Sequence, residues 1–280
     1  MGVLYLCSGP RSEIPFRLEG LQLNIYSLEE LCYYIKTNTL LLDHSFMSVE
    51  LCTWLDKEMG KKELSAQLGE LVSARGRLSD FVEKILMASG YCTREEIRDI
   101  LFVIHQMETK SEFECGKIRA DKLAEGCRYI QAIYEYRRLL ESEDAGRQNR
   151  ILLGNIRHNL GTCYARLFLF REAAACYLQA YRLNGKMESL KELLYSCMGM
   201  EEADDKTLIQ MAAEFHIDAN ALNTLRGSWK AAQTDKNFRE FSERMDQLEN
   251  MRRKAPKAFE ESAGQLLLDW KKDYRRICGN

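Results

Sequence analysis

GNIRHNLGTCYARLFLFREAAACYLQAYRLNGK, residues 154–186, is the stretch that decides the fold expected for this chain. Its pattern predicts two helices joined by a short turn, and Asn184-Gly185 marks the end of the second helix. On one face of each helix small residues sit among large ones: Gly161, Ala173 and Ala180 among Leu160, Tyr164, Phe170, Tyr177 and Leu183. Because a small side chain opposite a large one lets two helices approach closely, the stretch predicts an antiparallel helical hairpin.

The pattern of this stretch resembles a tetratricopeptide (TPR) repeat. The matching residues are Asn159-Leu160-Gly161 and Tyr164 in the first helix, and Ala173, Tyr177 and Ala180 in the second. Two positions depart from the family pattern, because Gly185 stands where the family often has proline and Arg157 replaces its usual early tryptophan or leucine. The resemblance implies a pair of packed helices that stacks on neighbouring pairs.

A second copy of the pattern is found at residues 113–142, shifted by 41 residues along the chain. The aligned pairs are Ala120 with Gly161, Leu123 with Tyr164, Ala132 with Ala173, and Tyr136 with Tyr177. Since the family period is about 34 residues, we expect a longer loop or an extra helical turn in the polar stretch 142–150. The resemblance therefore covers residues 113–187, about a quarter of the chain.

The rest of the chain also favours helices. The three prolines, Pro10, Pro15 and Pro256, lie near the ends, so the long body of the chain carries none. Capping-box patterns begin at Ser27 and Thr93. The helices that we expect outside the repeats start at Ser27 and lie at about 48–59, 62–75, 79–89, 93–107, 187–200, 205–217, 218–232, 235–253 and 257–277, the last two being the longest. The predicted fold class is all-α, an array of helical hairpins with a TPR-like centre.

Residues 1–26 are the one β-leaning segment of the sequence. VLYLC and IPFRLEGLQLNIY are separated by the turn cluster Ser8-Gly9-Pro10, which predicts a short β-hairpin or an extended arm. We accordingly divide the chain into an N-terminal helical region with this arm (1–110), the TPR-like repeats (111–200), and a C-terminal helical region that ends in two long helices (201–280).

Charge and cysteine usage restrict the function classes. Forty basic and forty-two acidic residues give a net charge of −2, which provides no general attraction to nucleic acid or to anionic lipid. The sequence shows neither a signal peptide nor an apolar run of about 18 residues, so we expect a cytoplasmic protein with no membrane contact. The ten cysteines are scattered without a C-x-x-C pair, which favours reduced core cysteines over a zinc site.

The sequence lacks the local motifs of common catalytic and metal-binding sites. The sequence contains no phosphate-binding glycine motif, no G-x-S-x-G and no H-E-x-x-H. His105 with Glu108 is the nearest approach to half a metal site, and an ordinary surface pair is the favoured interpretation. Asp204-Asp205 is better explained as the start of a helix than as a catalytic carboxylate pair. We expect no cofactor, no metal and no enzyme; an enzyme with a dispersed site is the second alternative.

The C-terminal helix provides the first alternative function. Lys271, Lys272, Arg275 and Arg276 alternate there with Trp270 and Tyr274. Such a face suits nucleic acid or an acidic protein, so the chain is alternatively a peptide-sensing regulator whose basic helix contacts nucleic acid. A solvated helix whose last turn carries cations is the simpler explanation.

The favoured function is that of a non-enzymatic adaptor or scaffold that binds a protein or peptide. In the TPR resemblance, the first helix of each repeat lines a concave surface, and its unpacked side chains contact the partner. Carried over residue by residue, these are Lys117, Asp121, Glu125, Asn155, His158, Thr162 and Arg166. Cationic residues in this set suggest an acidic segment in the partner.

Overall fold

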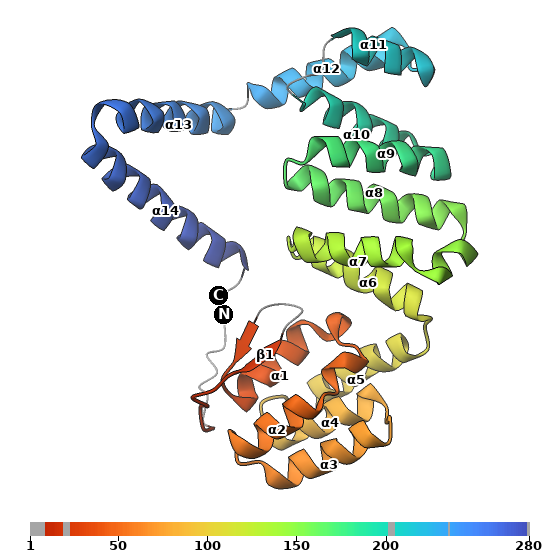
Figure 1. Ribbon diagram of the computed structural model, residues 1–280, viewed down its shortest axis with the longest axis vertical. Helices are drawn as coiled ribbons and strands as arrows, with labels where there is room; N and C mark the ends of the chain where they lie inside the picture. The colour runs from red at the N-terminus through yellow and green to blue at the C-terminus, as the bar shows by residue number, and fades with distance from the viewer. Residues whose placement is uncertain (1–8, 19–22, 201–204, 235, 279–280) are drawn as a thin grey trace. The chain divides into compact units, whose positions relative to one another are not determined.

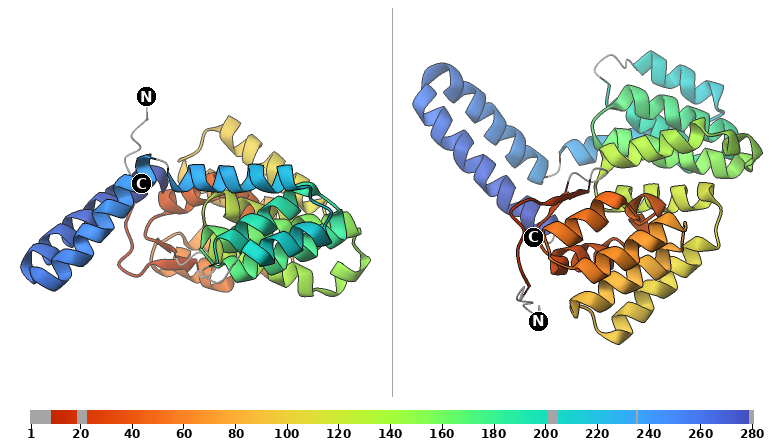
Figure 2. Two further views of the ribbon diagram at one scale, coloured as in Figure 1. Left: turned by 90° about the horizontal axis from the view of Figure 1, so that it is seen from above. Right: turned by 60° about the horizontal axis from the view of Figure 1, so that its bottom comes forward.

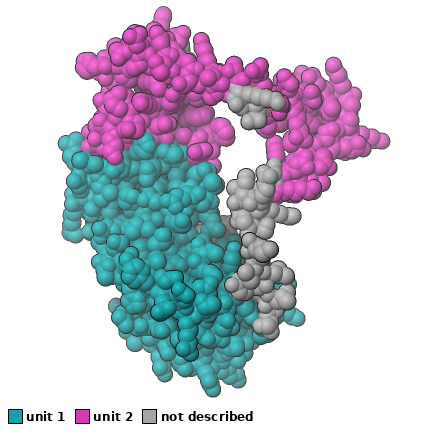
Figure 3. Space-filling view, turned by 180° about the vertical axis from the view of Figure 1, so that it is seen from behind, with its two compact units in different colours: residues 1–163 teal, residues 164–280 magenta. Residues whose placement is uncertain are grey.

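The computed structural model describes residues 9–18, 23–200, 205–234 and 236–278 of the chain. These residues contain fourteen α-helices, three 3₁₀ turns and one two-stranded sheet (Figure 1). The all-α fold class with one short hairpin near the N-terminus is therefore confirmed. By their internal contacts, the residues divide into two compact units, 1–163 and 164–280 (Figure 3). The boundary falls inside one helix, and the division at 110 and 200 stays a prediction.

The first unit begins with a two-stranded antiparallel sheet. Strand β1 (Phe16–Leu18) pairs with β2 (Leu23–Ile25), with Phe16 opposite Ile25 and Leu18 opposite Leu23. Both strands come from the second of the two predicted β segments, so Ser8-Gly9-Pro10 is not the turn between them. The predicted VLYLC strand lies outside the described residues.

Helices follow one another closely in the rest of the first unit. Their bounds are α1 Leu28–Thr37, α2 Val49–Lys57, α3 Lys62–Ser73, α4 Leu78–Ser89, α5 Arg94–Glu108, α6 Glu112–Glu125, α7 Tyr129–Glu141 and α8 Arg150–Arg166. The expected loop after α1 contains two 3₁₀ turns, η2 (Thr39–Leu41) and η3 (His44–Phe46). A third turn, η4 (Glu143–Arg147), lies in the stretch where an extra turn was predicted.

Side-chain caps explain where several of these helices begin. Thr93 and Glu96 form the complete predicted capping box at the start of α5. Ser27 caps α1 by accepting the Glu30 N–H, but the Glu30 carboxylate accepts the N–H of Tyr26, so that box is partial. At the other end, Gly90 closes α4 in the left-handed conformation at φ 66°, where a side chain would be strained.

The core of the first unit joins α1 through α5 to the hairpin. Fully buried residues from α1, α2 and α4, including Leu31, Leu51 and Phe81, form one cluster with Ile25 of β2. Trp54 donates its indole N–H to the Ile14 carbonyl oxygen at 2.9 Å, which fixes the segment before β1 against α2. This arrangement holds the hairpin against the helices.

Helices α6 and α7 form an antiparallel hairpin that packs small residues against large ones. Ala120, Ala132 and Tyr136 are each fully buried, as the repeat alignment predicts. Gly116 is part of the same contact, because a Cβ placed there would lie 2.6 Å from Cδ2 of Leu139. A larger residue at Gly116 would therefore require the buried Leu139 side chain to move.

The second unit contains the last turn of α8 and six further helices. These are α9 Phe170–Asn184, α10 Met187–Met198, α11 Asp205–Glu214, α12 Ala219–Gln233, α13 Lys236–Lys254 and α14 Pro256–Cys278. Helices α9 and α10 form a hairpin around Ala173 and Tyr177, and Tyr164 packs against the same cluster. Tyr164 and Tyr177 therefore share one apolar cluster, and the packing expected between the two helices of residues 154–186 stays a prediction.

Helices α13 and α14 pack against each other as a hairpin (Figure 2). Pro256 is the first residue of α14, as predicted. They are the longest helices in the described part of the chain, with 19 and 23 residues, as predicted. Phe241 stacks on Trp270 with ring centroids 6.2 Å apart, and Leu248 and Leu266 are buried apolar residues of the pair.

Candidate functional site

Six of the seven predicted partner residues lie in the first unit. Helix α6 carries Lys117, Asp121 and Glu125, four residues apart and so on one face. Helix α8 carries Asn155, His158, Thr162 and Arg166. Arg166 is the last residue of α8 and belongs to the second unit.

Asp121 is the centre of a polar network that joins three helices of the first unit. Its Oδ2 forms an ion pair with Nζ of Lys117 at 2.5 Å on its own helix. Its Oδ1 accepts hydrogen bonds from the Tyr136 hydroxyl on α7, at 2.5 Å, and from Nδ2 of Asn159 on α8, at 3.0 Å. We call these four residues, Lys117, Asp121, Tyr136 and Asn159, the Asp121 network.

The burial of Tyr136 determines which group donates the proton in its hydrogen bond with Asp121. Tyr136 is fully buried, and this desolvation, reinforced by the hydrogen bond to the Asp121 carboxylate, raises the pKa of its hydroxyl well above the ordinary value of 10. The hydroxyl therefore stays protonated and donates to Asp121. A carboxylate that accepts two hydrogen bonds and an ion pair is well satisfied, so Asp121 has a structural role at this face.

The remaining predicted residues of α8 lie around Asn159. Asn155 precedes Asn159 by four residues and Thr162 follows it by three, so both lie on the helix face that Asn159 turns toward α6. The Thr162 hydroxyl donates to the His158 carbonyl oxygen at 3.2 Å, one turn earlier. Asn155, His158 and Thr162 are each half-buried. The structure thus brings Lys117 and Asp121 beside the Asn159 face of α8.

Glu125 and Arg166 are placed differently. Glu125 is exposed near the end of α6, where its carboxylate pairs with Nζ of Lys122 at 3.2 Å. Arg166 is exposed and lies near Glu192 of α10, where its charge lowers the pKa of that carboxyl and partly offsets the larger rise caused by burial. No contact ties either residue to the Asp121 network among the described residues.

Asp121 and Lys117 were predicted at this face, but two of the donors that hold Asp121 were not. Tyr136 and Asn159 belong to the repeat pattern, which indicates packing and does not indicate that their polar atoms meet Asp121. A polar group inside a repeat contact is the signal that identifies them, because a buried tyrosine hydroxyl needs a hydrogen-bond partner.

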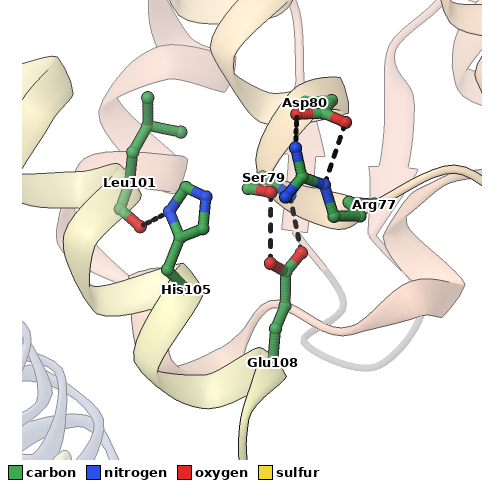
Figure 4. A network of polar contacts seen from close by, with 6 residues as sticks. All are labelled: Arg77, Ser79, Asp80, Leu101, His105 and Glu108. Atoms are coloured by element: carbon green, nitrogen blue, oxygen red, sulfur yellow. Dashed lines mark hydrogen bonds and ion pairs between the residues drawn. The ribbon is translucent and has the colours of Figure 1, made fainter.

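His105 and Glu108, the possible half of a metal site, do not point at a common position (Figure 4). Nδ1 of His105 lies 2.6 Å from the carbonyl oxygen of Leu101 on its own helix. The Glu108 carboxylate accepts the N–H and the hydroxyl of Ser79, at 3.0 and 3.1 Å, at the start of α4. Glu108 therefore caps α4, and the two residues do not form the surface pair that was expected.

The described residues contain neither a cluster of metal ligands nor a pair of catalytic acids at Asp205. No group of three or more His, Cys, Asp or Glu side chains is arranged to hold a metal ion there. Asp205, the first residue of α11, pairs with Arg226 at 2.8 Å, and Asp204 lies outside the described residues. No disulfide joins the eight cysteines whose side chains the structure describes.

The basic face predicted for the C-terminal helix is described only in part. Lys271 and Lys272 are exposed, Trp270 stacks on Phe241, and Arg253 pairs with Glu249 at 2.8 Å. The side chains of Tyr274, Arg275 and Arg276 lie outside the described residues.

A comparison with protein-family models finds no match for this chain, and comparisons with curated proteins and with solved structures find none either. Within the part of the chain that the structure describes, no helix has the length and apolar character needed to cross a membrane.

Proposed function

We propose that the chain is a non-enzymatic adaptor of the cytoplasm that binds a protein or peptide on the face formed by α6 and α8. The TPR-like interpretation of residues 113–187 belongs to this proposal. It is supported by an all-helical array in which neighbouring helices pack in pairs, as in helical repeats. The partner face consists of Lys117, Asp121, Asn155, His158 and Thr162, with Glu125 and Arg166 at the ends of their helices.

The observation that carries the proposal is the hydrogen bond between Asn159 and Asp121. It holds one face of α8 against one face of α6, so side chains far apart in sequence belong to a single polar surface. Half-buried polar groups on rigid helices suit recognition, because little side-chain freedom is lost when a partner binds. Lys117 forms an ion pair with Asp121, and His158 and Arg166 add basic side chains to the face, which suits an acidic partner segment.

A pull-down from an extract of the source cells tests the proposal with three variants of the full chain. Lys117→Ala/His158→Ala/Arg166→Ala removes the basic groups of the proposed face. The control variant, His44→Ala/Lys61→Ala/Arg98→Ala, removes one histidine, one lysine and one arginine at exposed positions of the first unit. Lys271→Ala/Lys272→Ala/Arg275→Ala/Arg276→Ala removes the basic C-terminal residues.

The expected result is that a partner retained by the wild type and by both other variants is lost from the first variant, whose helical circular dichroism is unchanged. Because Lys117 and His158 are half-buried, the unfolding temperature of the first variant is compared with that of the wild type, which separates loss of binding from loss of stability. Retention of every partner by the first variant, with loss in the C-terminal variant, would move the functional surface to α14.

A further inference from the structure

A second site is built on the opposite side of α6, inside the first unit. A cavity of about 600 Å³ lies between β1, α1, the turns η2 and η3, α6 and α7. Helix α6 contributes Arg119 and Leu123, each two residues beyond Lys117 and Asp121, and a step of two residues turns a helix by about 200°. The cavity therefore faces away from the Asp121 network, and we call it the Arg119 pocket.

Arg119 is a buried cation whose hydrogen-bonding groups are not used by the protein. Its residue is 9% exposed, and the nearest acid is Asp43, whose Oδ2 lies 3.9 Å from Nε. That distance allows an electrostatic attraction but exceeds the range of a hydrogen bond. The guanidinium carries five N–H donors, and none of them forms a hydrogen bond with another described residue.

Tyr34 adds a second buried donor to the same cavity. It is 7% exposed, lines the pocket, and its hydroxyl makes no hydrogen bond to the other described residues. Burial is the largest cause that raises its pKa, to about 12, with Arg128 opposing and Asp43 adding to the rise. The hydroxyl is thus a donor at neutral pH. Neither the Arg119 guanidinium nor the Tyr34 hydroxyl is among the fully enclosed atoms that lack a partner, so both donors are open to the space of the pocket, where water or a ligand can accept from them.

A carboxylate matches these donors in chemistry, because the planar fork of an arginine pairs with its two oxygens and a tyrosine hydroxyl donates to a carboxylate oxygen. The other walls are apolar and aromatic, from Phe16, Leu18, Leu41, Phe46 and Leu123. Phe46 is fixed between two rings, Tyr34 at 6.3 Å and Phe81 at 6.2 Å between centroids. The ligand therefore has an apolar body attached to its carboxylate.

The charges of the lining indicate a second, cationic group in the ligand. Two arginines, Arg17 and Arg119, are accompanied by three carboxylates, Asp43, Glu50 and Glu135. Glu135 is neutralised by Arg138 at 2.8 Å, whereas Glu50 has no ion pair among the described residues. A phosphate dianion would be repelled by these acids, but an ammonium group beside the carboxylate of the ligand would be attracted to them.

We propose that the Arg119 pocket binds a free amino acid or dipeptide with apolar side chains, holding its carboxylate on Arg119 and Tyr34 and its ammonium group near Asp43 and Glu50. The volume lies within the range of about 300–1,000 Å³ that is usual for small-ligand pockets and leaves room for two residues. This site is independent of the proposed partner face.

Isothermal titration of the full chain with the dipeptide L-leucyl-L-phenylalanine tests the proposal. The wild type is expected to bind it, and the C-terminal amide of the dipeptide is expected to bind at least about tenfold more weakly, since it cannot pair with a guanidinium. The N-acetyl dipeptide is also expected to bind more weakly, because it lacks the ammonium group. Free leucine and free phenylalanine are titrated in parallel.

Two variants connect the binding to named side chains. Arg119→Met keeps the apolar stem and should abolish binding, while Arg98→Met, at an exposed position of α5, should leave it unchanged. Tyr34→Phe removes one hydroxyl and should weaken binding severalfold, which keeps the test valid if Arg119→Met fails to fold. Absence of binding by the dipeptide and both amino acids up to about 10 mM overturns the proposal. Equal affinity for the N-acetyl dipeptide overturns the zwitterionic class of ligand.

Discussion

Asn159 on α8 donates a hydrogen bond from Nδ2 to Oδ1 of Asp121 on α6 at 3.0 Å, across 38 residues of sequence. The same oxygen accepts from the Tyr136 hydroxyl of α7, so one carboxylate connects three consecutive helices. Asp121 was predicted as a partner-binding residue, and its position in the network gives it a second task. It holds together the face to which it belongs.

Asp121→Ala should therefore destabilise the first unit, because it leaves the buried Tyr136 hydroxyl without its acceptor and frees Lys117. Loss of a partner for a buried polar group typically costs about 1–3 kcal/mol. Urea unfolding followed by circular dichroism measures the change. Glu125→Ala, which removes an exposed carboxylate from the same helix face, is the matched control and should stay within about 0.5 kcal/mol of wild type. Equal midpoints for the two variants would contradict the structural role of Asp121.

Gly116→Val should also destabilise the first unit, by overpacking the contact between α6 and α7. A Cβ at Gly116 would lie 2.6 Å from Cδ2 of Leu139, closer than carbon atoms pack, and overpacking typically costs about 1–3 kcal/mol. The double variant Gly116→Val/Leu139→Ala should lose less stability than the sum of the two single variants, because the second change makes room for the first. Additive losses would show that the two positions do not touch.

Helix starts were predictable from sequence wherever side chains near the start cap the backbone. Thr93 and Glu96 determine the start of α5 through contacts only three residues apart. Ser111 and Glu114 form another complete capping box at the start of α6, with the same spacing in the sequence. The hairpin turn near the N-terminus was placed wrongly, because Ser8-Gly9-Pro10 is a strong turn signal and β pairing depends on a partner strand elsewhere.

The functional sites were less predictable because their contacts are long-range. Helical periodicity placed Lys117 and Asp121 on one face, but the bond from Asp121 to Asn159 depends on how α6 and α8 pack. The Arg119 pocket gathers side chains from five segments of the first unit and leaves no local pattern in the sequence. The contact expected between Gly161 and Ala173 joins residues of the two units and stays a prediction.

Glu96 should make the first unit more sensitive to acid. Its pKa is lowered from the ordinary value of 4.5, chiefly by the hydrogen bond from Lys36 at 2.6 Å and then by the Thr93 N–H. Because the folded pKa lies below the unfolded one, this group contributes stability above about 4.5 that is lost as pH falls through the folded pKa.

Glu96→Gln is accordingly expected to lower stability near pH 7 and to reduce the further loss on acidification. Thermal unfolding at several pH values from about 7 to 3 measures both effects. Thr93→Ala is the companion variant, because it removes the hydroxyl that caps α5, which typically contributes about 1 kcal/mol, while the Lys36 ion pair is kept. It should shift stability at all pH values and keep most of the acid dependence. An unchanged pH profile in Glu96→Gln would refute the assignment.

Glu192 of α10 should give the second unit the opposite pH dependence, with lower stability as pH rises. Burial raises its pKa from 4.5, and the nearby charge of Arg166 only partly offsets that rise. Because the folded pKa lies above the unfolded one, the contribution of this group is fully present below the unfolded pKa and is lost as pH rises through the folded pKa. At neutral pH the half-buried carboxylate therefore destabilises the fold, and Glu192→Gln should raise the unfolding temperature there.

The same relationship makes Arg166 a testable partner of Glu192 as well as a member of the proposed binding face. Arg166→Ala removes the one opposing charge, so it should raise the pKa of Glu192 further and lower stability at neutral pH more than at about pH 4. In the Glu192→Gln background, Arg166→Ala should lose this pH dependence, since no carboxylate remains to respond. Arg171→Ala, at an exposed position of α9, serves as the control for loss of a surface arginine. If Arg166→Ala destabilises equally at both pH values and in both backgrounds, Arg166 does not act on Glu192, and its role is confined to the surface.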